Sequence, residues 1–331
     1  MTTFDGPYYE EMEKGLIFPA PPPVTIDSGL ASVYQSIVGE ALPLVLDQRI
    51  SRDVTGSEHR IVSPGLLLHL SIGASTVATK KVIANLFYRN IRILRPVFLG
   101  ETLHTVTEVV AMQDSQSKNS NALRGKVLLK ITTFANDEKV LEYLRAPLVR
   151  LKGQELPGHN DDLGSDPDLN LNDFQQPGYE DWDLKYLNNL EINGTQKTFK
   201  DPLKDVVDQA LSLVRLTQNV AAVHRDVAAS PYDNRLVYGG HTVALAQSSL
   251  SRMVPNTATI LGWHYCNHTA PVFEEDLLSF EHEILQEQGF GSGKIKDVRS
   301  KVYVHRGTEE PQEVLIGFPS FLQAEMESID E

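Results

Sequence analysis

The chain has 331 residues, 41% of them hydrophobic, and its formal net charge at pH 7 is −14. This length is enough for two ordinary domains, or for one large duplicated domain, with a sizeable core. The acidic balance opposes binding to nucleic acid or to an anionic membrane surface, and no run approaches the roughly 18 apolar residues of a membrane-spanning helix.

Cys266 is the only cysteine, which excludes an internal disulfide and fits a reducing compartment. Residues 1–13 are acidic and aromatic and contain no basic segment followed by an apolar run. No secretory signal is therefore expected, and we expect the protein in the cytoplasm.

The first half of the chain comprises residues 1–151. It begins with a proline-rich stretch at residues 18–23, which predicts an extended entry because proline cannot donate the hydrogen bonds of a central strand. A helix is expected from Asp27, a good N-cap residue, to Gly39, a typical helix end. Apolar residues recur at helical spacing across residues 30–37, in agreement with such a helix.

A second apolar helix is predicted after Pro64-Gly65. Strands are predicted beyond Asn85, because at residues 126–131 an apolar set, Val127, Leu129 and Ile131, alternates with Lys126, Leu128 and Lys130. Residues 152–183 then contain turn formers and charges without periodicity, which is typical of a linker. The linker also carries large aromatic residues, so part of it should lie against the folded body. These are Phe174, Tyr179 and Trp182.

The second half, residues 184–331, repeats this order. A helix is predicted from Asp201-Pro202, with a buried stripe that includes Val206 and Val214. Another helix is predicted from Gly240-His241 onward, and strands follow, most clearly at residues 298–305. Each half is therefore a helical segment followed by an antiparallel sheet, which predicts an α+β fold.

The two halves also repeat each other in sequence. Arg95-Pro96-Val97-Phe98 returns 175 positions later as Ala270-Pro271-Val272-Phe273, and the same spacing relates Ser63-Pro64-Gly65 to Tyr238-Gly239-Gly240. A period of this length indicates two copies of a domain-sized unit.

These features together resemble a known family, the MaoC-like dehydratases, which include the R-specific enoyl-CoA hydratases. The resemblance is to their double hot-dog form, and residues 218–219 and 235–241 are most similar to the branch that contains mesaconyl-CoA hydratases. It covers nearly the whole chain except the linker. It implies a long helix wrapped by a curved antiparallel sheet in each half, and an acyl-CoA thioester as the ligand.

The family's signature, Asp-x-Asn-Pro-x-His-x-Asp, places an Asp and a His on either side of the substrate double bond. In the second half, His224 matches the catalytic histidine and Asn219 stands where the Asp is expected. An amide cannot accept a proton as a carboxylate does, but it can hold a water molecule. The resemblance therefore implies that His224 activates water and Asn219 orients it. Asp226 matches the last signature position and Asp47 stands opposite it in the first half, which favours a structural role for both.

Residues 238–241 form the predicted start of a helix. A glycine in the first turn lets a thioester carbonyl approach unpaired N–H groups, and the helix dipole favours the negative charge that develops on its oxygen. By resemblance Gly240 has this catalytic role, and Tyr238, Gly239 and His241 are expected to bind substrate. The alternatives are that the paired glycines form a plain turn and that His224 is an ordinary packed or solvated histidine.

The matched first-half positions are Glu40, Val45 and Leu66. Glu40 keeps a carboxylate, but Val45 stands where the histidine would be. Family precedent puts the working site in the second half and the acyl tail against the first. These three residues are therefore expected on the acyl side of the pocket.

The leading hypothesis is an enoyl-CoA hydratase or β-hydroxyacyl-CoA dehydratase of fatty acid metabolism that needs no cofactor beyond its CoA thioester substrate. The alternatives are an acyl-CoA or fatty-acyl binding protein, favoured by Asn219, and an acyl-CoA thioesterase that would use Glu40.

His264 and His268 flank Cys266, but no further ligand is near in sequence, so no metal is expected. No nucleic-acid or membrane partner is expected, and a homodimer is compatible with the sequence.

Overall fold

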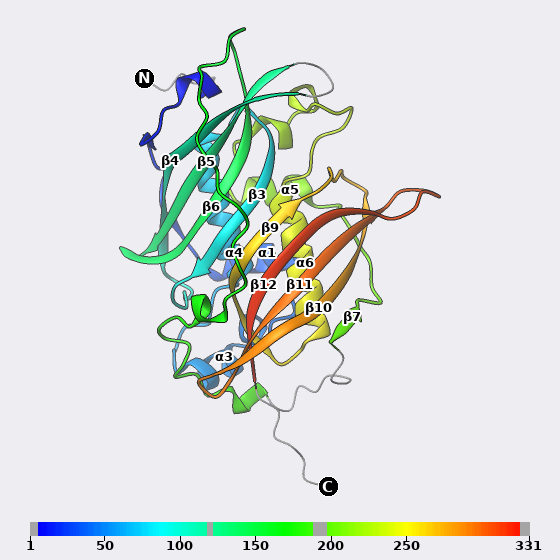
Figure 1. Cartoon of the computed structure of the whole chain (residues 1–331). Coiled ribbons are helices and arrows are strands. Elements are labelled where there is room, and N and C mark those ends of the chain that lie inside the picture. The colour runs from blue at the N-terminus through cyan, green and yellow to red at the C-terminus, as the bar shows by residue number, and fades with distance from the viewer. Residues whose placement is uncertain (1–5, 118–121, 188–196, 325–331) are drawn as a thin grey trace.

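The computed structural model describes residues 6–117, 122–187 and 197–324. The fold is α+β, as predicted: one large antiparallel sheet curves around a set of helices (Figure 1). None of the helices in these ranges is both long enough and apolar enough to cross a membrane.

Within its described residues, the first half has four α-helices and six strands. The helices are α1 (Ser28–Val38), α2 (Pro43–Leu46), α3 (Gln48–Thr55) and α4 (Pro64–Ser75). The strands are β1 (Ile17–Phe18), β2 (Val24–Thr25), β3 (Val82–Ile93), β4 (Thr102–Gln116), β5 (Leu123–Ala135) and β6 (Glu138–Arg150).

The second half has the same order with shorter helices at its start. Its helices are α5 (Ala210–Leu216) and α6 (Gly239–Met253). Its strands are β7 (Thr198–Lys200), β8 (Asp205–Val206), β9 (Thr257–His268), β10 (Leu277–Phe290), β11 (Gly293–His305) and β12 (Gln312–Ala324). The strand order β1-β4-β5-β6-β3-β9-β12-β11-β10-β7 joins the two halves at β3 and β9.

Helix α1 has the ends that its sequence predicts. The Asp27 carboxylate accepts a hydrogen bond from the Leu30 N–H at 2.7 Å, which satisfies one of the unpaired donors of the first turn. Gly39 ends the helix with φ +65°, a left-handed conformation that glycine adopts without steric cost.

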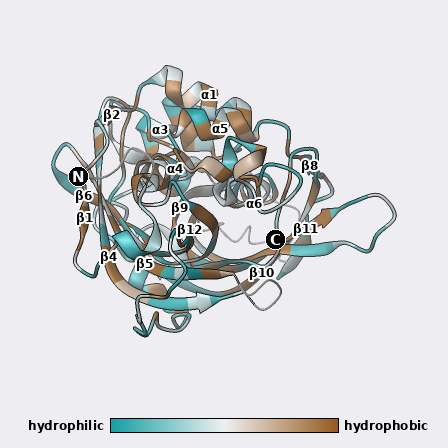
Figure 2. Ribbon diagram, turned by 90° about the horizontal axis from the view of Figure 1, so that it is seen from above, coloured by the Kyte–Doolittle hydropathy of each residue, from teal (hydrophilic) through white to brown (hydrophobic). Residues whose placement is uncertain are grey.

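Helices α4 and α6 lie against the concave face of the sheet, and α1 and α5 form an outer layer over them (Figure 2). Almost every residue of α4 is buried, because the helix is apolar on all sides and packs between the sheet and the outer layer. The first turns of α4 and α6, at residues 64 and 239, are therefore held in place by packing on several sides.

The repeated Pro-Val-Phe sequence forms the same turn in both halves. Glu101 accepts a hydrogen bond from the Phe98 N–H, and Asp276 accepts one from the Phe273 N–H, each at 2.7 Å. An arginine pairs with each carboxylate, Arg95 with Glu101 and Arg306 with Asp276. The acidic residue of the repeat therefore stabilises this turn in both halves, and in neither does it line the cavity between them.

The predicted helix start at Asp201-Pro202 is wrong, although the helix itself is present as α5 with Val214 buried in it. Asp205–Val206 forms the short strand β8, which pairs with Leu277 and Leu278 of β10, and the helix begins only at Ala210. Val206 is 42% exposed and does not belong to a buried stripe. Residues 205–206 therefore form a strand because they pair with β10, although the spacing of the apolar residues predicts a helix.

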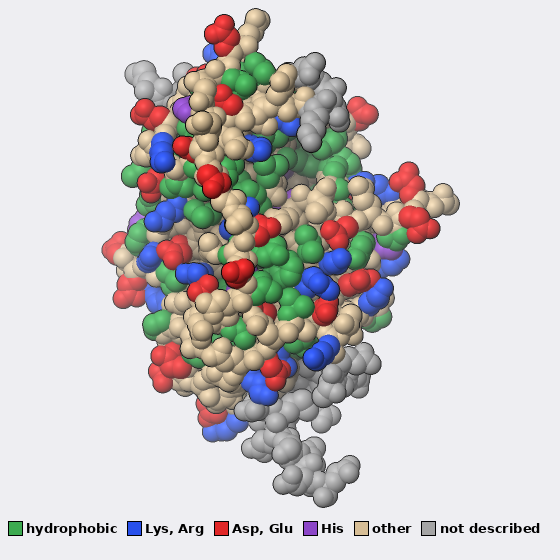
Figure 3. All heavy atoms as spheres, in the orientation of Figure 1, with side chains coloured by type: hydrophobic (Ala, Val, Ile, Leu, Met, Phe, Trp, Pro, Cys, Tyr) green, Lys and Arg blue, Asp and Glu red, His purple; other side chains and the backbone are tan. Residues whose placement is uncertain are grey.

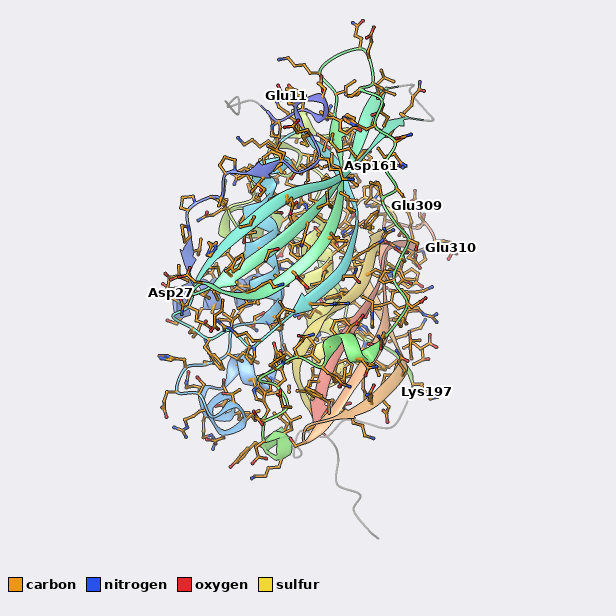
Figure 4. The ribbon with its side chains drawn as sticks, turned by 60° about the vertical axis from the view of Figure 1, so that its left-hand side comes forward. Glu11, Asp27, Asp161, Lys197, Glu309 and Glu310 are labelled. Atoms are coloured by element: carbon orange, nitrogen blue, oxygen red, sulfur yellow. The ribbon has the colours of Figure 1, made fainter. Side chains whose placement is uncertain are left out.

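The linker lies against the body, as predicted. Phe174, Tyr179 and Trp182 are at most 3% exposed. At the start of the linker, Asp161 accepts a hydrogen bond from the Met112 N–H of β4 at 3.0 Å, and it lies beside this strand in Figure 4. The linker is therefore part of the packed structure and not a free tether.

Gly262 lies at the junction of the two halves. On β9 it pairs with Arg92 of β3 and with Ser320 of β12. Its φ is +154°, and a Cβ atom at this position would overlap the carbonyl oxygen of Ile91 and press on the Phe174 ring. Only glycine lets the two half-sheets approach this closely.

Gly262→Ala should lower the free energy of unfolding by about 2–4 kcal/mol, because it adds backbone strain and overpacking at once. Chemical denaturation measures this change. Gly289→Ala on β10 is the matched control, since nothing lies within 4 Å of the added methyl group. Equal unfolding midpoints for the two variants would contradict the role assigned to Gly262.

Candidate active site

A cavity of about 200 Å³ lies between the two halves. One wall comes from the first half: β3, β6 and the short 3-10 helix η2 (Thr76–Ala78) with the residues that follow it. The other wall comes from the second half: the loop 219–238, the start of α6 and residues 268–272. Neither half encloses the cavity by itself.

Two backbone N–H groups of the second-half loop donate hydrogen bonds to the first half. The Val220 N–H donates to the Thr76 hydroxyl at 2.9 Å, and the Ala222 N–H donates to the Lys80 carbonyl oxygen at 3.2 Å. These contacts lie between Asn219 and His224, so they fix both candidate residues relative to the first-half wall.

His224 lies at the end of the 3-10 helix η5 (Ala222–His224) and is partly exposed to the cavity. Its Nδ1 lies 2.8 Å from the Leu236 carbonyl oxygen. Because a carbonyl oxygen can only accept, Nδ1 carries the proton and Nε2 is left with a free lone pair. Burial lowers the pKa of His224 to about 4, and the nearby charge of Arg145 lowers it further. The imidazole is therefore neutral at pH 7 and able to accept a proton.

Asn219 is completely buried beside the same cavity. Its Oδ1 accepts a hydrogen bond from the Ala221 N–H at 2.9 Å, which leaves the buried Nδ2 amide group without a partner among the described residues. The free group at this position is therefore a hydrogen-bond donor. It can hold a water or substrate oxygen but cannot act as a base.

The start of α6 presents Gly239, not Gly240, to the cavity. The side of Gly240 is covered by the ring of Tyr238, which a Cβ atom on Gly240 would overlap. Tyr238 itself lines the cavity, and its buried hydroxyl has no partner in the described chain. The first N–H groups of a helix have no intrahelical acceptor, so this end of α6 remains a site for a polarised oxygen.

Five lining side chains have a buried polar atom with no hydrogen-bond partner among the described residues, which is a strong sign of a ligand or water site. His268 is one of them, and its ring lies against Gly239. Burial, and secondarily the neighbouring His224, lower the pKa of His268 to about 4. The five atoms are Asn85 Oδ1, Arg145 Nε, Asn219 Nδ2, Tyr238 Oη and His268 Nε2.

Besides Gly240, four expected site residues do not line this cavity: Glu40, Val45, Leu66 and His241. Glu40 is enclosed, accepts a hydrogen bond from Gln247 at 2.9 Å, and has its pKa raised by burial. Val45 and Leu66 are part of the apolar core. His241 is 1% exposed within α6.

The first-half counterpart of the site is filled by a side chain. The hydroxyl of Tyr34 occupies the space next to Gly65, the position that corresponds to Gly240. The same hydroxyl is 3.0 Å from His69 Nδ1, so it is fixed in place. The first half thus keeps the helix start of the repeat with a tyrosine hydroxyl packed beside Gly65, and Gly65 does not line the cavity.

Two of the residues considered as metal ligands, His264 and Cys266, are enclosed in the fold away from the cavity. His264 bonds to Asp297 at 3.0 Å, and Cys266 is buried. Among the described residues no group of three or more His, Cys, Asp or Glu side chains could hold a metal ion. In Figure 3, acidic and basic side chains are intermixed on the visible face and form no patch of one sign.

No family model matches the chain. Mesaconyl-CoA hydratase of Cereibacter sphaeroides is 24% identical over 94% of this chain and 92% of that protein. Beta-methylmalyl-CoA dehydratase of Chloroflexus aurantiacus is 26% identical over 90% of this chain and 89% of that protein.

Two solved structures have the same fold along their whole length. One, assigned as a MaoC domain dehydratase of Chloroflexus aurantiacus, has a TM-score of 0.84 and 22% identity over 98% of this chain and 99% of that chain. The other is a conserved hypothetical protein of Mycobacterium tuberculosis with a double hot-dog fold. Its TM-score is 0.87 and its identity 36% over 96% of this chain and 99% of that chain. The chain belongs to the MaoC-like double hot-dog family.

Within this MaoC-like chain, the last signature position is structural. Asp226 accepts a hydrogen bond from the Ala228 N–H at 3.0 Å and caps the helical turn that follows it. Its first-half counterpart Asp47 caps α3 in the same way, through the N–H groups of Arg49 and Ile50. This agrees with the structural role expected for both carboxylates.

The sequence interpretation missed Arg145 and His268 in this MaoC-like site. Arg145 follows Leu141 and Tyr143 at every second position of β6, and all three are buried. A basic residue in the inward-facing set of a strand was the available signal. His268 is the last residue of β9, and its place beside Gly239 depends on the tertiary fold.

The protonation of His224 should be measurable by NMR. Since its folded-state pKa is about 4, below the ordinary 6.5, the ring signals should stay constant from pH 8 to about 5 and change only near pH 4. Arg145→Gln should move this midpoint upward, because it removes a positive charge that opposes protonation. His224→Gln assigns the signal, and a wild-type midpoint near 6.5 would contradict the buried neutral imidazole.

Proposed function

We propose that this protein catalyses the reversible addition of water across the α,β double bond of an enoyl-CoA thioester. The reverse reaction is the dehydration of a β-hydroxyacyl-CoA. The proposal depends most on the state of His224, a neutral imidazole whose Nδ1 is held by the Leu236 carbonyl and whose Nε2 is free at a cavity.

The chemistry needs one group that takes a proton and one region that accepts negative charge. His224 takes a proton from water as the water oxygen bonds to the β-carbon, and charge then develops on the thioester oxygen. The start of α6 at Gly239 stabilises this charge. Protonated His224 returns the proton to the α-carbon, which completes the addition without net loss of a proton by the enzyme.

Asn219 contributes an N–H donor and not a base. Its free Nδ2 holds the oxygen of the attacking water, so that the lone pair points toward the β-carbon. The two curated relatives, named for the hydration of mesaconyl-CoA and the dehydration of beta-methylmalyl-CoA, support a CoA thioester as substrate.

The first test is turnover. Protein incubated with crotonyl-CoA, longer trans-2-enoyl-CoAs and mesaconyl-CoA should remove the enoyl-thioester absorbance of at least one of them. His224→Gln should reduce kcat by about 10²–10⁴-fold with little change in ligand affinity, because the base acts mainly in the transition state. His59→Gln, an exposed histidine that does not line the cavity, is the matched control.

Other outcomes point to the other functions considered for this chain. Saturable acyl-CoA binding without turnover would favour a binding protein. Release of free thiol in place of hydration would favour a thioesterase, and Glu40→Gln would then identify whether the buried carboxylate takes part.

Asn219→Asp should raise the hydration rate. One carboxylate oxygen can keep the hydrogen bond from Ala221, while the other places a base where the Nδ2 group now lies. General base catalysis is typically worth roughly 10²–10⁴-fold. Asn85→Asp, which changes another amide of the cavity wall, should give no such increase. An unchanged rate in Asn219→Asp with the fold intact would mean that His224 alone handles the proton.

A further inference from the structure

Arg145 is a buried cation without a counter-ion. It is 3% exposed, and no other arginine or lysine in the described part of the chain is buried to this degree. Within that part, its side chain forms no ion pair with a carboxylate. Its one hydrogen bond there runs from Nη2 to Thr79 Oγ1 at 2.6 Å, and Nε has no partner.

Two partly buried arginines of the described chain are neutralised by carboxylates. Arg252 pairs with Asp201 and Asp205, and Arg95 pairs with Glu101. A buried charge without such a partner is costly, because the protein interior replaces its hydration poorly. An unpaired guanidinium that the fold nevertheless keeps therefore indicates an anion supplied from outside the chain.

The guanidinium belongs to the cavity wall. Arg145 lies directly opposite Tyr88 across the β3–β6 pair, and both residues line the cavity together with Thr79. The hydroxyl of Thr79 accepts from Arg145, so its own proton is available to a second acceptor. The Arg145 guanidinium with its unpaired Nε–H, and the Thr79 hydroxyl, could therefore donate hydrogen bonds to the two oxygens of a carboxylate.

The size of the cavity limits what the anion is attached to. A volume of about 200 Å³ is below the roughly 300–1,000 Å³ of pockets that enclose drug-sized ligands, so it holds a short acyl group and not a phosphoadenosine. Arg145 is also close enough to His224 for its charge to lower the pKa of that histidine. Arg145 and His224 also line the same cavity, so the anion lies in the same small pocket as the reacting carbon atoms.

We propose that Arg145 and Thr79 bind a carboxylate at the far end of the acyl group, so that the preferred ligands are short CoA thioesters of dicarboxylic acids. This inference rests on the proposed function for the identity of the ligand as an acyl-CoA. In it, Arg145 is a specificity-determining residue, and the first half of the duplicated chain recognises a charged end of the acyl group and not an apolar tail.

The test compares two saturated ligands that differ only at this end. Succinyl-CoA carries a carboxylate where butyryl-CoA carries a methyl group. Isothermal titration should give succinyl-CoA an affinity about 10- to 100-fold higher than butyryl-CoA, the usual effect of a charged hydrogen-bonded contact. Arg145→Gln should remove this preference by weakening succinyl-CoA alone, and Arg145→Lys, which keeps the charge, should retain part of it.

Lys130→Gln is the control for a general change of charge. It removes a cation from the exposed face of the neighbouring strand β5, outside the cavity, and should leave the affinity ratio unchanged. Equal affinities of the two ligands in the unmodified protein would overturn the proposal even if every Arg145 variant failed to fold. A loss of both affinities in Arg145→Gln would also overturn it, since Arg145 would then contact the thioester or the CoA moiety. Free succinate bound as tightly as succinyl-CoA would contradict an acyl-CoA ligand.

This test does not depend on turnover, because neither saturated ligand can be hydrated. A preference for succinyl-CoA without hydration of fumaryl-CoA would support the subsite and reject the proposed reaction. Hydration of crotonyl-CoA as fast as fumaryl-CoA, with no preference for succinyl-CoA, would support the reaction and reject the subsite.

Discussion

The pairing of β3 with β9 is the constraint on which the rest of the molecule depends. It joins two half-sheets into one, and it sets β6 and η2 of the first half against the loop 219–238 of the second. Gly262 permits the close approach, and the hydrogen bonds from Val220 and Ala222 fasten the loop. The cavity is therefore a property of the duplicated molecule and not of either copy.

Electrostatics in this cavity follow from its enclosure. Burial favours neutral imidazoles at His224 and His268, and the single buried guanidinium of Arg145 strengthens the same tendency at His224. A ligand carboxylate at Arg145 would offset that charge and make His224 more basic. Substrate recognition and the strength of the base are thus linked through one side chain.

The duplication of the fold and the ends of α1 could be predicted from the sequence, because both follow from patterns of residues that are close together in the chain. The repeat revealed the duplication, and the capping residues Asp27 and Gly39 set the ends of α1. His224 and Asn219 lie five residues apart in one loop, and both line the cavity. Their catalytic roles stay predictions.

The remaining features depend on contacts that no local pattern encodes. The ring of Tyr238 covers Gly240, and Tyr34 from another helix fills the space beside Gly65. Val206 lies in β8 because it pairs with β10, although the spacing of the apolar residues predicted a helix there. Arg145 faces the cavity because of the register between β3 and β6, which only the assembled sheet defines.

The junction at β3 and β9 also bears on why the two copies remain in one polypeptide. A single copy would end its sheet with one of these strands, each twelve residues long, and would present its row of unpaired backbone groups to any other chain. Covalent fusion gives each edge a high effective concentration of its proper partner. Joining the two copies by the linker therefore favours pairing of β3 with β9 within one molecule over pairing of either edge with a neighbouring molecule.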